Sequence, residues 1–200
     1  MTDNLERREF TIDESKGQGT YALSLVENPA MQSEYITLSE EKVQLAVTDK
    51  ERGVIMGVAL IPNRDVLRKG RNGKPDYYLY FSEETVRRSS EIFLENNYHQ
   101  NSTLGHQTRL NGNVVIESWI KEDEVHDKSA IHNLDAPVGS WLVTMKVSDE
   151  QLIQMSKEGK LRGFSIEGMY DDADAEDEDI NQDIEAAKLM IEILENEVIN

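Results

Sequence analysis

The sequence predicts an α+β fold that is mainly β, arranged as a barrel or a sandwich. Eight segments are predicted strands, and several of them are rich in β-branched and aromatic residues and end at Gly, Pro or Asn. Two segments carry the capping residues that begin a helix. A chain of 200 residues, 38% of them hydrophobic, can build one core without disulfides, and it contains no cysteine. Many strands with few helices therefore favour a β-rich domain.

The predicted strands are short apolar runs, and several of them alternate apolar and polar residues. In chain order they span 8–12, 20–26, 43–47, 54–61, 77–81, 114–120, 140–147 and 163–170. Residues 64–76 are polar and basic with two glycines and a proline, which predicts a loop. Residues 121–138 are rich in acids and predict a second long loop, and loops of this length in a compact domain are often functional.

Two helices are predicted between these strands. Ser82 begins the first, which runs to about residue 96 and carries two glutamates in its first turn, where negative charge is favourable. Ser148 begins the second, because Gln151 lies three residues further on, as in a capping box. Gly159 ends this helix, since glycine readily adopts the left-handed conformation that follows a last turn.

The chain changes character at residue 171. Residues 1–170 hold all the predicted strands and form the predicted folded domain. Residues 171–179 are almost entirely acidic and predict a solvated linker. Apolar residues in 180–200 recur every three or four positions, which predicts an amphipathic, heptad-like helix that packs on its own domain, on a partner or on another copy. The residues of this stripe are Ile180, Ile184, Ala187, Ile191, Leu194 and Val198.

Charge and composition exclude several classes of function. The formal net charge is −18, from 39 acidic and 21 basic residues, so direct binding to nucleic acid is not expected. No apolar run reaches the ~20 residues that span a bilayer, and no membrane association is predicted. The lack of cysteine excludes disulfides, zinc–thiolate sites and cysteine nucleophiles, and it suits a reducing cytoplasm.

Three residues are candidates for nucleophilic chemistry. Ser165 lies in the segment GFSIEG of residues 163–168, at the start of the last predicted strand, where it can present its hydroxyl to a substrate. His106 can supply the base that removes the hydroxyl proton at physiological pH. Glu117 lies in an apolar strand, where a carboxylate needs a partner, and a carboxylate that orients an imidazole completes a catalytic triad.

Several segments resemble, in consistent order, the phage prohead (procapsid maturation) serine protease family, in its XkdF-like branch. They are YALSLVENPA at 21–30, GH at 105–106, VIESWI at 115–120, GSW at 139–141 and GFSIEG at 163–168. The resemblance covers roughly residues 8–170. A related branch of these proteases places an acidic residue eleven positions after the histidine, where Glu117 lies in this sequence.

The resemblance implies a prohead protease domain over residues 1–170. Its fold would be a compact β-barrel surrounded by a few helices, similar to the herpesvirus maturational protease. Ser165 would be the nucleophile and His106 the general base, with an acyl-enzyme intermediate and with no metal or other cofactor. Glu117 is the predicted orienting acid. The nearby loop holds three other candidates for this third member: Asp123, Glu124 and His126.

The same resemblance implies partners and a location. The expected substrates are the scaffolding protein and the major capsid protein, and the enzyme is expected to cleave itself. Self-association is expected as well, because the family enters the procapsid together with the scaffold. The resemblance therefore places the protein in the host cytoplasm, inside the phage procapsid, where confinement raises the local concentration of enzyme and substrate.

Two other classes of function compete with the protease. In the first, the chain is a non-catalytic, scaffold-associated capsid-assembly protein that docks through its acidic carboxy-terminal helix. In the second, it is a metal-dependent hydrolase that binds the metal through histidines, although their spacing matches no usual ligand pattern. The histidines concerned are His99, His106, His126 and His132.

Overall fold

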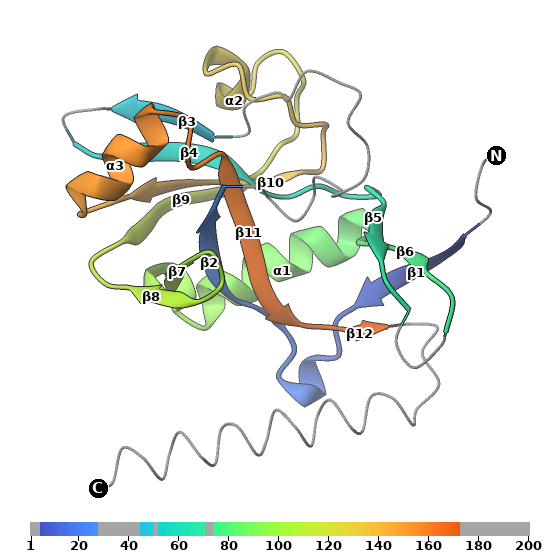
Figure 1. The fold of residues 1–200 in the computed structure, drawn as a ribbon. Helices are drawn as coiled ribbons and strands as arrows, with labels where there is room; N and C mark the ends of the chain where they lie inside the picture. Colours follow the sequence, from blue (N-terminus) through green and yellow to red (C-terminus); the bar gives the residue numbers. More distant parts are fainter. Residues whose placement is uncertain (1–4, 28–44, 50–51, 71–73, 173–200) are drawn as a thin grey trace, which may run out of the picture.

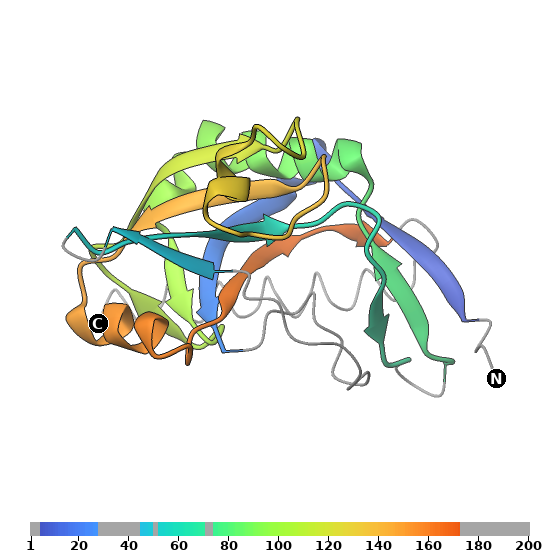
Figure 2. The ribbon, with the colours of Figure 1, turned by 90° about the horizontal axis from the view of Figure 1, so that it is seen from above.

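The computed structural model describes residues 5–27, 45–49, 52–70 and 74–172. In this part of the chain the strands form three four-stranded sheets, and three α-helices accompany them (Figure 1, Figure 2). The predicted α+β, mainly β class is confirmed. The strand orders leave every sheet open among the described residues, so the closed barrel is not confirmed.

The first sheet lies at one side of the molecule, as Figure 1 shows, and has the order β12-β1-β6-β5. Its strands are β1 (Glu6–Thr11), β5 (Val66–Arg68), β6 (Tyr77–Tyr80) and β12 (Asp171–Asp172). β1 and β6 run parallel, whereas β12 and β5 pair antiparallel at the two edges. The strands predicted at 8–12 and 77–81 are therefore confirmed within two residues at each end.

The second sheet is antiparallel throughout and has the order β3-β4-β10-β9. Its strands are β3 (Leu45–Asp49), β4 (Val54–Leu60), β9 (Val114–Ile120) and β10 (Trp141–Lys146). All seven residues of β4 are buried, and so are the first five of β10, because these two strands lie in the middle of the sheet. The sequence predicts all four strands, and β9 has the predicted bounds.

The third sheet has the order β11-β2-β7-β8 and runs through the centre of the molecule in Figure 1. Its strands are β2 (Gly19–Val26), β7 (Ser102–Leu104), β8 (Thr108–Leu110) and β11 (Gly163–Met169). β11 pairs antiparallel with β2, β2 pairs parallel with β7, and β7 forms a hairpin with β8. This sheet carries two of the three candidate catalytic residues, Ser165 and His106.

The two predicted helices are present. In α1 (Glu83–Glu95), Ser82 caps the first turn, because its Oγ accepts the Thr85 N–H at 3.3 Å. In α3 (Glu150–Lys157), the capping residue is Asp149, whose carboxylate accepts the Gln151 N–H at 2.7 Å. The cap predicted at Ser148 is therefore wrong by one residue. Gly159 follows α3 with a φ of +69°, and the helix ends there as predicted.

Several short elements are absent from the predictions. The predicted loop 64–76 contains β5, and the predicted loop 121–138 contains α2 (Lys128–Ile131). The three-residue strands β7 and β8 were not predicted either, and two 3₁₀ turns add to this group: Glu14–Lys16 and Tyr98–Gln100. Elements of three or four residues show too little periodicity to be recognised in the sequence.

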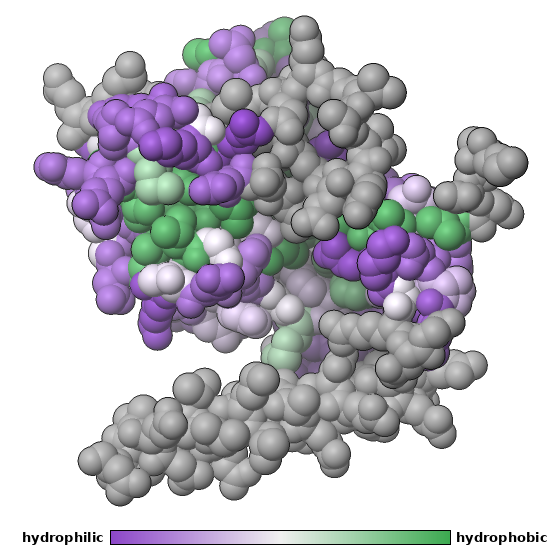
Figure 3. Space-filling view, viewed as in Figure 1, coloured by the Kyte–Doolittle hydropathy of each residue, from purple (hydrophilic) through white to green (hydrophobic). Residues whose placement is uncertain are grey.

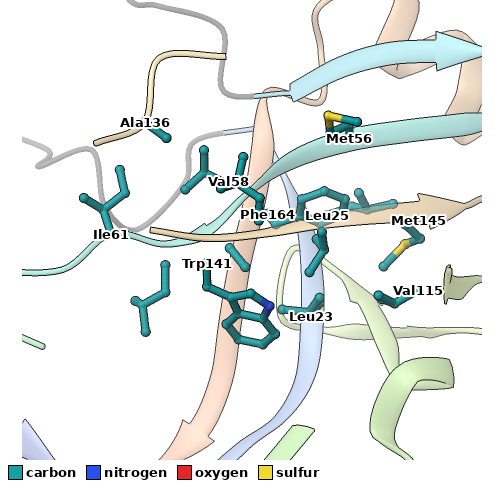
Figure 4. Packing of buried hydrophobic residues seen from close by; sticks show 14 of the residues in the cluster. Leu23, Leu25, Met56, Val58, Ile61, Val115, Ala136, Trp141, Met145 and Phe164 are labelled. Carbon is teal, nitrogen blue, oxygen red and sulfur yellow. The ribbon is translucent and has the colours of Figure 1, made fainter. Parts of the chain in front are cut away.

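The core lies between the second and third sheets, with α1 packed against β2. Figure 4 shows Leu23, Leu25 and Phe164 of the third sheet beside Trp141 and Met145 of β10. All five side chains are buried to within 1%. The face of β2 and β11 that carries Leu23, Leu25 and Phe164 therefore packs into the core, and the alternate residues of both strands point to the opposite face.

The end of the described chain is bound to its beginning. Asp171 accepts hydrogen bonds from Lys16 Nζ at 2.7 Å and Gln18 Nε2 at 2.5 Å, and Asp172 forms an ion pair with Arg8 at 3.3 Å. Residues 173–200, which hold most of the predicted linker and the predicted helix at 180–200, lie outside the described residues.

The surface is largely polar. Figure 3 shows hydrophilic residues over most of the described surface in that view, with an apolar area between the positions of α3 and β8. Within the described ranges, no helix combines the length and the apolar character that crossing a membrane requires.

Candidate active site

The candidate nucleophile lies at one end of a row of polar side chains across the third sheet, on the edge strand β11. Ser165 of β11 is directly opposite Ser24 of β2, and Ser24 is opposite Thr103 of β7. Residues opposite each other in an antiparallel pair project from the same face. Ser165 and Ser24 therefore share the face that points away from the apolar core. Both residues are buried, with 4% and 0% of their surface exposed.

His106 lies in the tight turn between β7 and β8. Gly105 and His106 occupy its two central positions, and φ is +58° at both. The Gln107 N–H donates to the Leu104 carbonyl at 3.2 Å and closes the turn. Positive φ at both central positions is the pattern of a type I′ turn, which suits a hairpin because its twist matches that of the strands. Histidine is enriched among the non-glycine residues that adopt this conformation.

Two hydrogen bonds hold this turn against β2. The Gly105 N–H donates to the Leu25 carbonyl at 3.0 Å, and the His106 N–H donates to Ser24 Oγ at 2.9 Å. Ser24 Oγ also lies 3.5 Å from the Thr103 carbonyl, to which its hydroxyl can donate. The main chain of His106 is therefore bonded to the cross-strand neighbour of the candidate nucleophile.

A carboxylate from β11 contacts the His106 ring. His106 Nδ1 lies 3.1 Å from Glu167 Oε1, and the same oxygen accepts a hydrogen bond from Thr103 Oγ1. Glu167 is two residues after Ser165, so both side chains leave β11 on the same face. Bonding at Nδ1 leaves Nε2 as the nitrogen that can accept a proton from a hydroxyl. In the described part of the chain the Ser165 hydroxyl makes no hydrogen bond, and none joins it to His106.

Glu117 lies on the second sheet and has another partner. Its carboxylate forms an ion pair with Lys128 of α2, and Lys128 also lies 4.5 Å above the Trp119 ring. The Lys128 ammonium holds the pKa of the Glu117 carboxyl below its usual value. Glu117, Lys128 and His132 line a pocket of about 420 Å³. No contact joins Glu117 to His106 among the described residues, and the orienting role of Glu117 stays a prediction.

Comparison with known protein families decides the relationship of this chain. The family model described as "Putative phage serine protease XkdF" matches residues 42–174. The chain belongs to this family of phage serine proteases. No curated protein and no solved structure matches it. The matched region of this XkdF-family chain includes Ser165, His106, Glu117 and Glu167, whereas Ser24 precedes it.

The other candidates for the third catalytic member of this XkdF-family protein lie in the loop after β9. Asp123 accepts the backbone N–H groups of Val125 and His126, both at 2.7 Å, and these bonds lower the pKa of its carboxyl. His126 Nδ1 is 3.1 Å from Asp123 Oδ1, and the imidazole is 83% exposed. Glu124 pairs with the buried Lys121 at 2.8 Å. These contacts stabilise the loop, and none of them reaches Ser165 or His106.

The residues proposed for a metal site are not brought together. Among the described residues, no group of three or more His, Asp or Glu side chains is arranged to hold a metal ion. His106 contacts Glu167 and His126 contacts Asp123, in each case as a single pair. The contacts of the described histidines therefore give no support to the metal-dependent alternative.

Sequence reasoning missed three residues of this site: Ser24, Thr103 and Glu167. Glu167 could have been identified as a candidate, because it lies in the GFSIEG segment two positions after Ser165. The two-residue period of a strand places such residues on one face. Ser24 and Thr103 gave no comparable signal. Their roles depend on the register of β2 with β11 and β7, which the sequence does not specify.

We expect Ser24→Ala to loosen the turn that carries His106. The substitution removes the acceptor of the His106 N–H from a fully buried position, so we expect a loss of ~1 kcal/mol in the free energy of unfolding. Chemical denaturation measures this loss, and hydrogen exchange at the His106 amide should become faster. Ser156→Ala is the control, because the Ser156 hydroxyl bonds only within α3, to the Leu152 carbonyl. Unchanged exchange at His106 in Ser24→Ala would contradict the anchoring role.

Proposed function

We propose that this chain is a prohead maturation protease that hydrolyses peptide bonds through an acyl-enzyme on Ser165, with His106 as general base and then general acid. One observation carries the proposal. The β7–β8 turn, which carries His106, is bonded to Ser24, the cross-strand partner of Ser165. Membership of a family of phage serine proteases supports the same reaction.

The proposed reaction proceeds in two stages. Ser165 Oγ attacks the carbonyl carbon of the scissile peptide while its proton passes to Nε2 of His106. The tetrahedral intermediate collapses, the C–N bond breaks, and the departing amine takes that proton. Water then attacks the ester carbonyl and gives a proton to His106. The second collapse breaks the bond to Ser165 Oγ, which regains the proton, and releases the new carboxylic acid.

The proposed substrates are those of procapsid maturation. We propose that the enzyme acts inside the procapsid, in the host cytoplasm, on the scaffolding protein, the major capsid protein and other copies of itself. Enclosure of enzyme and substrates in one small shell raises their effective concentration, so weak substrate binding suffices. We also propose that the complete domain closes its sheets as a barrel, similar to the herpesvirus maturational protease.

A covalent serine reagent tests the nucleophile directly. Diisopropyl fluorophosphate should add one phosphoryl group to the native protein, and peptide mass spectrometry should locate it at Ser165, because the proposed mechanism has the His106 imidazole activate this hydroxyl. The same reagent applied to the unfolded protein should give no selective adduct, and buried serines such as Ser129 and Ser140 are internal controls. Selective labelling of another serine would move the nucleophile to that residue, whereas no labelling of the native protein would support the non-catalytic assembly role.

A further inference from the structure

We infer that Glu167 is the carboxylate that orients His106, and that Thr103 fixes Glu167 for this task. This inference rests on the proposed protease function and adds a positioning pair to it. Glu117, which sequence reasoning put forward for the same role, contacts Lys128 instead. If Glu167 orients His106, Glu167→Gln should impair the enzyme. If Glu117 does so, Glu117→Gln should impair it instead.

The Glu167 carboxylate and the His106 imidazole are in direct contact. His106 Nδ1 and Glu167 Oε1 are 3.1 Å apart, a distance typical of a hydrogen bond. The His106 side chain is 41% exposed, but that of Glu167 is only 17% exposed, so the bond is partly shielded from water. A carboxylate that accepts the Nδ1 proton selects the tautomer with a free lone pair on Nε2, which is the state a general base requires.

The spacing of Ser165 and Glu167 along β11 suits a shared site. Ser165 and Glu167 are two residues apart on one face, which separates their Cα atoms by about 6.5–7 Å. An imidazole that bonds at both ring nitrogens needs a hydrogen bond of about 3 Å at each end. The contact at Nδ1 with Glu167 is present, and the proposed mechanism requires the second one, between Nε2 and Ser165 Oγ. One strand carries both the proposed nucleophile and the proposed orienting acid.

The Glu167 and Glu117 carboxylates differ in their electrostatic surroundings. Within the described residues the ionisable side chain in contact with Glu167 is His106, whereas the Glu117 charge is already balanced by Lys128. An unbalanced carboxylate stabilises an imidazolium that forms beside it more than a neutralised one does. Burial, and secondly the charge of Glu167, raise the pKa of the Tyr21 hydroxyl above its usual value.

Thr103 completes the arrangement. Its Oγ1 donates to the same carboxylate oxygen that faces the imidazole, and Thr103 lies on β7, in register with Ser24 of β2. A hydroxyl donor two strands away limits the rotamers that the Glu167 side chain can adopt. The proposed acid and nucleophile thus lie on β11, and the base lies in the β7–β8 turn of the same sheet.

The experiment compares Glu167→Gln, Glu117→Gln and Thr103→Val with the wild type and with Ser165→Ala. The substrate is a peptide spanning a junction that the wild-type enzyme cleaves in the scaffolding protein, located by mass spectrometry. Glu167→Gln should lower kcat by about 10²–10⁴-fold with KM nearly unchanged, because an amide cannot hold the required charge and tautomer. Thr103→Val, which keeps the side-chain shape, should lower kcat by roughly 10-fold.

A second readout does not depend on activity. In the wild type, proton NMR should show the Nδ1–H of His106 far downfield, as expected for a proton shared with a carboxylate, and Glu167→Gln should lose this signal. Glu158→Gln controls for the chemistry of the substitution, since Glu158 pairs with Lys160 at the end of α3. Circular dichroism establishes that each variant is folded.

The outcomes separate the inference from the proposed function. If Ser165→Ala is inactive but Glu167→Gln cleaves normally, the protease function stands and the role of Glu167 is overturned. Loss of activity in Glu117→Gln, with none in Glu167→Gln, would assign the orienting role to Glu117. If Ser165→Ala cleaves like the wild type, the proposed function fails. In that case a His106 proton signal that persists in Glu167→Gln would also overturn the contact between the two side chains.

Discussion

Ser165→Ala is expected to stop cleavage of the scaffolding protein, with kcat lower by about 10⁶-fold, as when a serine protease loses its nucleophile. The serine hydroxyl is the atom that forms the acyl-enzyme, and alanine offers nothing in its place. Ser24, the nearest hydroxyl across the sheet, cannot substitute for it, because its Oγ is fully buried and accepts the His106 N–H.

The loss should be one of chemistry and not of folding. In the described structure the Ser165 hydroxyl has no hydrogen-bond partner, so its removal leaves no buried donor or acceptor unsatisfied. We therefore expect the free energy of unfolding to change by no more than about 0.5 kcal/mol. Co-expression with the scaffolding and major capsid proteins, followed by mass spectrometry of the products, measures the cleavage. Unchanged products in the variant would remove Ser165 from the mechanism.

The largest expected effect on stability is that of Trp141→Ala. Trp141 is fully buried, its ring packs edge-on against Phe93 at 5.4 Å, and its Nε1–H donates to Ser118 Oγ at 2.8 Å. Truncation would leave a large cavity between β10 and α1, at an expected cost of about 3–5 kcal/mol. The total stability of a domain is typically about 5–15 kcal/mol, so the variant should approach unfolding near body temperature.

Chemical denaturation followed by circular dichroism tests this expectation. Trp141→Phe is the matched control, because it keeps an aromatic ring against Phe93 and removes the hydrogen bond to Ser118. It should destabilise the protein by a smaller amount than alanine does. A cost below about 1 kcal/mol for Trp141→Ala would mean that this part of the core can collapse around the missing side chain.

The long elements could be predicted from the sequence because the order of their apolar and polar residues matches the order of buried and exposed positions. In β4 and β10 the continuous apolar runs reflect strands covered on both faces, and in β9 the predicted bounds 114–120 are those of the structure. The same reasoning could not reach β7 and β8. Each has three residues; β7 is defined by its pairing with β2, which is distant in the chain, and β8 is defined by its pairing with β7.

The candidate site shows the same limit. Ser165 and His106 were identified by their chemistry, and the structure places both on the third sheet. The contact between the imidazole and Glu167 could not be predicted from the sequence, although Glu167 lies two positions after Ser165, because Glu167 is 61 positions from His106 and meets it only through the register of β11, β2 and β7. A strand register fixed by packing carries information that a single sequence does not display.

The place of β11 in the chain also has a consequence for timing. β11 is the last long strand of the described residues, and it carries both Ser165 and Glu167, whereas its partner β2 is near the amino terminus. A nascent chain that has already formed the His106 turn still lacks the hydroxyl and the acid. Pairing over such a sequence separation forms late in folding, because a long loop must close first. Synthesis itself thus delays the assembly of the site until almost the whole domain has emerged from the ribosome.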